Sequence, residues 1–116
     1  MKITNKIIDC ITFYSENFIF DFRYNVIKDH VDFLVVCESK FDHRGNPKQL
    51  NFDIEKYSKD KKIKYIILED KFPNNSDPWN NQALQRDYIL KNLPFADDED
   101  YIFFSDPDEI PNIKIL

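Results

Sequence analysis

The sequence has little cysteine and no long apolar segment, and these absences exclude several kinds of protein. Cys10 and Cys37 are the two cysteines among 116 residues, and both fall in apolar runs. Two buried free thiols fit this placement better than a disulfide, and no Cys/His spacing indicates a zinc site. No apolar run approaches the roughly 18 residues of a membrane span, and the amino terminus lacks the apolar segment of a signal peptide. We therefore expect a cytoplasmic protein.

Basic residues are outnumbered by acidic ones. The 16 lysines and arginines against 21 aspartates and glutamates give a formal net charge of −5. This balance disfavours nucleic acid as a partner, because binding its phosphate backbone requires clustered positive charge. An anionic nucleotide would need a metal ion or a few placed basic groups to offset the repulsion.

Short apolar runs alternate with helix-like segments along the chain. The expected strands are 7–13, 31–37, 63–68 and 101–104, and the expected helices are about 16–28, 52–57 (weak) and 79–92. This alternation through short connections predicts an α/β fold with a mostly parallel sheet and helices on both faces. No linker or repeat divides the chain, so residues 1–116 are expected to form a single domain.

The two longer helices have recognisable faces and ends. The first helix has apolar residues at every fourth position, with one more beside them, and these are expected to form its buried face: Phe18, Phe22, Val26 and Ile19. In the last helix, Asp77 is expected to cap the first turn, which contains Pro78. Trp79 is expected to anchor that helix to the core.

The most informative segment is the apolar strand that ends at Asp106-Pro107-Asp108-Glu109. Spacing of i, i+2 in extended chain sends the carboxylates of Asp106 and Asp108 to the same side. Hard oxygen ligands at the carboxyl end of a buried strand suit Mg²⁺ or Mn²⁺ that carries a diphosphate. Glu109 is either a supporting group or a solvated neighbour.

The Asp-x-Asp pattern alone carries little weight in so acidic a chain, because Asp98-x-Asp100 is a second copy. The second copy lies in an acidic turn before the strand. Asp106 and Asp108 lie at the strand exit, where open α/β sheets bind their ligands. The competing interpretation is that the pair caps a following helix or keeps a loop solvated.

Candidate nucleotide-binding residues lie at the ends of the first two expected strands. Phe13 and Tyr14 could stack on a nucleobase or belong to the core. Glu16 could hydrogen-bond to the nucleotide at the exit of the same strand, or its charge could favour the first turn of its helix. Glu38 ends a buried strand, where it would hydrogen-bond a nucleoside or form an ion pair with Lys40 or Arg44.

Basic residues elsewhere could contact the nucleotide. The guanidinium of Arg86 could bind a phosphate through two hydrogen bonds or form a surface ion pair. His43 and Lys48 flank Gly45, the one glycine of the chain, which is expected in a left-handed turn. Their loop could reach over a bound nucleotide or be solvated.

Four segments occur in the order seen in a known family and cover the chain from about Ile7 to Pro111. They are residues 9–16, residues 38–48, Trp79 with Gln85-Arg86, and residues 105–111. On these segments the chain resembles glycosyltransferase family 17, the family of β-1,4-mannosyl-glycoprotein β-1,4-N-acetylglucosaminyltransferase, which has many bacterial and viral relatives.

The resemblance implies an inverting transferase of GT-A type, with a Rossmann-like sheet, that passes a sugar from a nucleotide donor to a glycan acceptor. UDP-N-acetylglucosamine is the donor it suggests. It also implies a divalent cation, Mn²⁺ or Mg²⁺, with Asp108 as direct ligand and Asp106 touching the ribose or a metal-bound water. Because family members continue well past Pro111, we expect the acceptor half and the catalytic base to lie beyond Leu116.

The chain departs from the family pattern at a few positions. Asn81 and Gln82 replace an Arg-Glu pair, Asp87 replaces an asparagine, and Pro107 replaces a small or aliphatic residue. Because the sequence ends five residues after Pro111, a second interpretation is a non-catalytic nucleotide-sugar-binding domain or a truncated inactive fragment. A phosphohydrolase that uses Asp-x-Asp as nucleophile is disfavoured, because its nucleophile would follow the first strand rather than the fourth.

Overall fold

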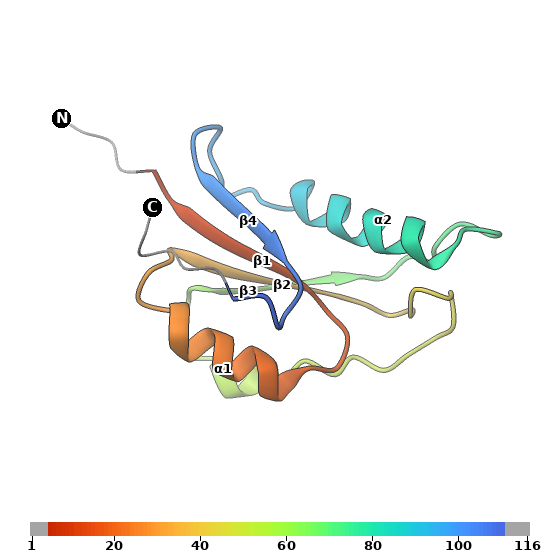
Figure 1. Cartoon of the computed structure of the whole chain (residues 1–116), viewed down its shortest axis with the longest axis horizontal. Helices are drawn as coiled ribbons and strands as arrows, with labels where there is room; N and C mark the ends of the chain where they lie inside the picture. Colours follow the sequence, from red (N-terminus) through yellow and green to blue (C-terminus); the bar gives the residue numbers. More distant parts are fainter. Residues whose placement is uncertain (1–4, 111–116) are drawn as a thin grey trace.

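A four-stranded parallel sheet forms the centre of the chain in the computed structural model, which describes residues 5–110 (Figure 1). The strands lie in the order β3-β2-β1-β4, and every neighbouring pair is parallel. Their bounds are β1 (Ile7–Phe13), β2 (Phe33–Ser39), β3 (Ile63–Leu68) and β4 (Tyr101–Ser105). The predicted α/β fold with a parallel sheet is confirmed.

Helices cover both faces of this sheet, as the sequence predicts. Helix α1 (Asn17–Ile27) and the short 3₁₀ helix η1 (Ile54–Tyr57) lie on one face, and α2 (Pro78–Leu90) lies on the other (Figure 1). Two separate apolar clusters result, one containing Phe20 of α1 and the other containing Ile89 of α2. The α/β sheet therefore buries apolar residues on both sides.

The predicted buried face of α1 is wrong. The structure buries Phe20, Arg23 and Ile27, whereas Phe18 is 85% exposed and Phe22 is 59% exposed. Val26 is also exposed and Ile19 is half-buried. Two stripes of this helix have helical spacing, and the buried one contains the arginine because Asp9 of β1 lies opposite and pairs with it.

Helix α2 begins as predicted, but the prediction that Trp79 packs in the core is wrong. Asp77 accepts a hydrogen bond from the backbone N–H of Asn80 at 2.7 Å, and Pro78 is the first helical residue. Trp79 does not anchor the helix, because it is 81% exposed. The buried face consists of Asn81, Gln85 and Ile89. Its polar members fit there because their amides bond backbone carbonyls.

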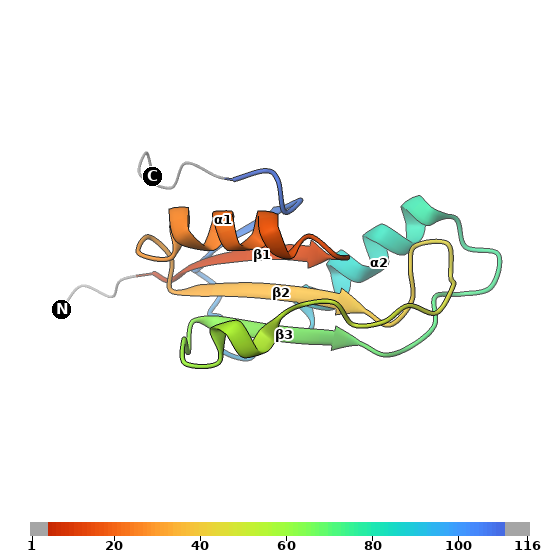
Figure 2. The same ribbon diagram turned by 90° about the horizontal axis from the view of Figure 1, so that it is seen from below.

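The connections create a crevice at one edge of the sheet. From β1 the chain moves outward to β2 and β3, and then returns to the other side of β1 as β4. Figure 2 shows β1, β2 and β3 running in the same direction, so their carboxyl ends meet at one edge. In open α/β sheets, ligands bind at this edge where the strand order reverses, which here is between β1 and β4.

The two cysteines are buried free thiols, as expected. Burial raises the pKa of the Cys37 thiol to about 12 and raises that of Cys10 further. Both thiols are therefore protonated at neutral pH and unreactive. None of the helices within residues 5–110 has the length and apolar character needed to cross a membrane. Pro111, the last residue of the motif that begins at Ser105, lies outside the described residues.

Candidate functional site

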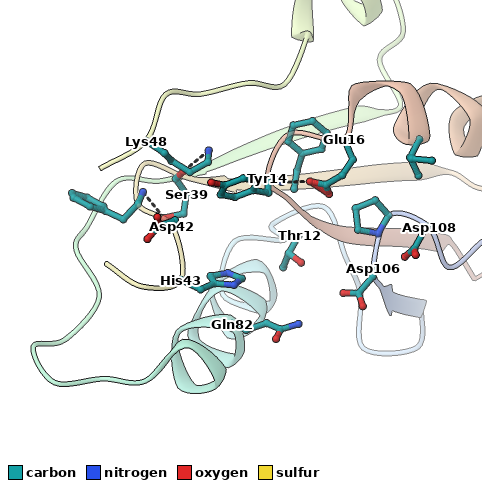
Figure 3. Close-up of a pocket in the computed structure, with 14 residues that line it drawn as sticks. Thr12, Tyr14, Glu16, Ser39, Asp42, His43, Lys48, Gln82, Asp106 and Asp108 are labelled. Atoms are coloured by element: carbon teal, nitrogen blue, oxygen red, sulfur yellow. Dashed lines mark hydrogen bonds between the residues drawn. The ribbon is translucent and has the colours of Figure 1, made fainter. Parts of the chain in front are cut away.

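A cavity of about 520 Å³ opens at the carboxyl edge of the sheet, beyond β1, β2 and β4 (Figure 3). It is lined by seven of the nine predicted site residues: Phe13, Tyr14, Glu16, His43, Lys48, Asp106 and Asp108. Its other polar lining residues include Thr12, Asp42 and Gln82. The structure thus brings together residues that are up to 95 positions apart (13 to 108) in the sequence.

Asp106 and Asp108 lie at one end of the cavity, away from Asp42 and Lys48 (Figure 3). Both aspartates are exposed, and Pro107 between them is buried. The backbone forms a tight turn in which Glu109 Oε1 accepts from the Asp106 N–H at 3.0 Å. Within residues 5–110 no hydrogen bond reaches either aspartate carboxylate, so both are available to a ligand.

Glu109 therefore supports the motif rather than standing free. Its side chain bonds the Asp106 N–H, and its own N–H donates to the Asp106 carbonyl at 2.9 Å. These two bonds close the turn on itself. Of the two interpretations that the sequence left open for Glu109, a supporting group fits this geometry.

The sequence analysis missed Arg23, which is fully buried beneath the same turn. Its guanidinium makes a bidentate pair with Asp9 and also donates to backbone carbonyls of the turn, including Glu109 O at 2.7 Å. The available signal was Asp9 itself, a carboxylate inside an apolar strand that must find a partner. Nothing in the spacing identified that partner.

Tyr14 presents an aromatic ring at the cavity mouth. It is 53% exposed, and the Lys48 ammonium lies 5.4 Å from the ring centroid. Glu16 holds this turn, because its Oε1 accepts from the N–H groups of Tyr14 and Ser15 at 3.0 and 2.6 Å (Figure 3). Phe13 is buried and packs edge-on against Phe52, so its ring belongs mainly to the core.

Glu38 does not line the cavity. Its side chain is fully buried and accepts four hydrogen bonds, from Lys48 Nζ, from the Tyr65 hydroxyl and from two backbone N–H groups, at 2.6 to 3.0 Å. The ion pair suggested by the sequence exists, but its cation is Lys48 rather than Lys40 or Arg44. Because these bonds occupy both oxygens, Glu38 holds the segment after Lys48 in place and does not contact a donor directly.

Lys48 is occupied in the same way. Its ammonium donates to Glu38 Oε2, to the Ser39 carbonyl and to the Gln49 carbonyl at 2.7 to 3.0 Å. An ammonium has three N–H donors, so none remains for a phosphate. Lys48 lines the cavity through the rest of its side chain.

Two α2 side chains position His43. Gln85 Nε2 donates to the Cys37 carbonyl at 2.9 Å, which turns Gln85 Oε1 toward His43 Nε2 at 2.7 Å. Asn81 Nδ2 donates to the His43 carbonyl at 2.7 Å. Among the buried side-chain oxygens and nitrogens of residues 5–110, Asn81 Oδ1 is the one without a hydrogen-bond partner. His43 Nδ1 also has no hydrogen-bond partner, and since it is not among these buried atoms, it is accessible.

Residues 42–46 form a tight turn in the loop that contains His43 and Lys48. Asp42 Oδ1 accepts from the N–H groups of Arg44 and Asn46, both at 2.9 Å, and Gly45 has a φ of +88° as predicted. Burial raises the pKa of Asp42, but these hydrogen bonds outweigh it and the pKa falls below 3.8. The turn therefore keeps an ionised carboxylate at the cavity wall.

Arg86 is not brought to the cavity. It is exposed on α2, on a different side of the helix from Asn81 and Gln85, and it does not line the cavity. Without Arg86, and with Lys48 neutralised by Glu38, the cavity wall carries more negative than positive charge: Glu16, Asp42, Asp106 and Asp108. A diphosphate would therefore need a cation to enter.

The two free aspartates fit a divalent cation as part of its ligand set. Within residues 5–110, no three Asp, Glu, His or Cys side chains are grouped closely enough to hold a metal by themselves. Carboxylate oxygens are the ligands that Mg²⁺ and Mn²⁺ prefer, and Mg²⁺ commonly binds one or two carboxylates together with phosphates and water. Asp106 and Asp108 match that donor set.

Comparisons with known proteins give one match. The family model described as glycosyltransferase family 17 matches residues 1–116. No curated protein and no solved structure matches the chain. The family match therefore rests on the sequence, and the site geometry above is independent of it.

Proposed function

The chain belongs to glycosyltransferase family 17, and we propose that its cavity binds a nucleoside-diphosphate sugar together with a divalent cation. Membership of the family supports a glycosyltransferase function. The metal, the donor and the stereochemical course are the proposal. The observation that carries it is the pair of free carboxylates, Asp106 and Asp108, in a cavity at the point where the strand order reverses.

The cation would be held by Asp106 and Asp108, whose carboxylates receive no hydrogen bond within residues 5–110. Bound there, it would supply positive charge that stabilises the departing nucleoside diphosphate. The charge balance of the cavity supports this requirement, because the one lysine in the wall is already paired with Glu38.

The protein's own residues would bind the rest of the donor. The exposed ring of Tyr14 offers a surface on which a nucleobase can stack, and it lies between Lys48 and Glu16, apart from the aspartates (Figure 3). His43 Nδ1 can accept a hydrogen bond from a ribose or sugar hydroxyl, because its Nε2 is committed to Gln85. Glu16 fixes the turn that carries Tyr14.

The sugar, the acceptor and the inverting course rest on the family resemblance rather than on the cavity. N-acetylglucosamine on uridine diphosphate and a glycan acceptor are the first compounds to test. We assign no catalytic base to a residue of this chain. Transfer with inversion would need one, and a binding domain without turnover would not.

The test is calorimetric titration of UDP-N-acetylglucosamine and other nucleotide sugars into the purified chain, with and without Mn²⁺. We expect binding in the presence of Mn²⁺ and a loss of about 10-fold or more in affinity for Asp108→Asn and Asp106→Asn. Asp98→Asn is the matched control, because Asp98 belongs to the other Asp-x-Asp pattern and is exposed far from the cavity.

The outcomes separate the alternatives. Equal losses in the motif and control variants, or no binding of any nucleotide sugar by a folded chain, would contradict the proposed donor site. Binding followed by transfer to a glycan identifies an enzyme, and the anomeric configuration of the product, read by proton NMR, shows whether it inverts. Binding without transfer favours the non-catalytic donor-binding interpretation.

A further inference from the structure

We propose that Arg23 is a positioning residue that sets the backbone of the Asp106-Pro107-Asp108 turn and so aims the two carboxylates into the cavity. The inference rests on the proposed function for its consequence in binding, but its structural claim can be tested without any ligand. It concerns a residue of α1 that lines no part of the cavity itself.

All five N–H donors of this guanidinium have acceptors. Nε and Nη2 hold the carboxylate of Asp9 in a bidentate pair, and Nη2 also donates to Ser105 Oγ at 2.7 Å. Nη1 donates to the carbonyls of Asp106 and Glu109 at 3.1 and 2.7 Å, with the Pro107 carbonyl at 3.4 Å. One side chain therefore bonds three backbone carbonyls of the single turn that follows β4.

These contacts determine which way the turn faces. Carbonyls that point inward to a buried cation leave the side chains of Asp106 and Asp108 to point outward, and both are exposed while Pro107 is buried. Asp9 neutralises the guanidinium, so the aspartate carboxylates are not drawn in to pair with it. The Asp9–Arg23 pair thus holds the backbone and leaves the motif's own charges free.

A lysine cannot replace this arginine in the same role. Its ammonium can pair with Asp9, but it is a single point of charge with three donors and cannot span a carboxylate and a set of carbonyls at once. The variant Arg23→Lys can therefore keep the ion pair with Asp9, but it loses the hydrogen bonds to the carbonyls of the turn. A purely structural ion pair would be largely preserved by this change.

The experiment measures amide hydrogen exchange of the free chain by NMR. In Arg23→Lys we expect the amides of Asp106 and Glu109 to exchange at least about tenfold faster, while those of β1 and β2 keep their protection. In the same variant, the affinity for UDP-N-acetylglucosamine with Mn²⁺ should fall about 10- to 100-fold, as for other residues that orient metal ligands. The Tyr14 side of the cavity should be unaffected, so affinity for uridine without phosphate should not change.

Two further variants keep the test decisive. Ile27→Ala is the matched control, because it removes a buried contact of the same helix that makes no hydrogen bond to the turn. It should destabilise the fold without selectively loosening Asp106 and Glu109. If Arg23→Lys does not fold, the paired variant Asp9→Asn/Arg23→Gln removes both charges together and avoids a buried unpaired ion.

Unchanged exchange at Asp106 and Glu109 in either folded variant would overturn the proposal. So would equal loosening by Ile27→Ala, because the effect would then be general destabilisation. If the wild-type chain binds no nucleotide sugar, the proposed function fails. The exchange data would still decide whether Arg23 holds the turn.

Discussion

Lys48 Nζ donates to Glu38 Oε2 at 2.7 Å inside the protein, where the two side chains are 8% and 0% exposed. Each had seemed from the sequence to be a candidate contact for a nucleotide. The pair instead fastens the segment that follows the cavity loop to the end of β2, because Glu38 also accepts from the backbone N–H groups of Asn51 and Phe52. The wall of the cavity depends on this buried charge pair, whose charged atoms are already bonded within the protein.

Replacing Lys48 should therefore cost stability. Lys48→Met leaves Glu38 buried without its cation, and we expect the free energy of unfolding to fall by about 3 kcal/mol. Urea denaturation followed by circular dichroism measures the change. Lys40→Met is the control, since Lys40 pairs with Glu69 at the surface and should change stability by less than about 1 kcal/mol. Equal losses for the two variants would contradict the buried pair.

The buried face of α1 can be tested with two phenylalanines of the same helix. Phe20 is 1% exposed and Phe18 is 85% exposed. Phe20→Ala should lower the free energy of unfolding by about 3 to 5 kcal/mol, because it leaves a cavity among the aromatic rings it contacts. Phe18→Ala should change it by less than about 0.5 kcal/mol. The opposite order in thermal or urea unfolding would restore the face that the sequence predicted.

Stability should decrease in acid. The hydroxyl of Tyr24 donates to Asp60 and lowers the pKa of that carboxyl below 3.8, and hydrogen bonds lower the pKa of Asp100 likewise. The unfolded chain then binds more protons than the folded one near and below pH 3.8, so the free energy of unfolding falls as pH decreases through that range. Urea midpoints from about pH 6 down to 3 measure the slope.

The variant Asp60→Asn isolates one contribution to this acid sensitivity. It should have a shallower dependence on pH than the wild type, because the titrating carboxylate is gone while the amide oxygen can still accept from Tyr24. Asp98→Asn, at an exposed residue with no hydrogen bond within residues 5–110, should follow the wild-type curve. A steeper slope in Asp60→Asn would contradict the assigned hydrogen bond.

His43 should be protonated on Nε2 in its neutral form. The Cys37 carbonyl can only accept, so Gln85 must direct its amide N–H there and its oxygen to His43 Nε2, which then has to donate. Imidazole nitrogen shifts in ¹⁵N NMR at about pH 8, where an ordinary imidazole is neutral, report the tautomer. Gln85→Met should remove the preference, and an Nδ1–H form in the wild type would show that Nδ1 cannot accept from a ligand.

The sequence predicted the elements well because each strand is a short apolar run and the start of α2 has a local cause. Asp77 and Pro78 start α2 by side-chain capping and a fixed φ, which depend on neighbours in the chain alone. The motif at Asp106 and Asp108 was found because a strand exit can be recognised locally. The face of α1 was predicted wrongly because two stripes have the same period, and the choice depends on Asp9 of another element.

By itself, the sequence determined the order of strands and helices, the exposed position of the Asp106 and Asp108 pair, and the family. The first two follow from periodicity and turn chemistry, which act over a few residues, and the family follows from the order of short motifs along the chain. The tertiary structure alone decided which charged side chains are paired within the protein and which are available to a ligand. Glu38 and Lys48 lie ten positions apart, and Arg23 lies 86 positions from Glu109. They meet because the loop after β2 folds back over the end of that strand, and because α1 packs on the sheet with Arg23 against Asp9 and the turn after β4. Charges buried in this way must be paired.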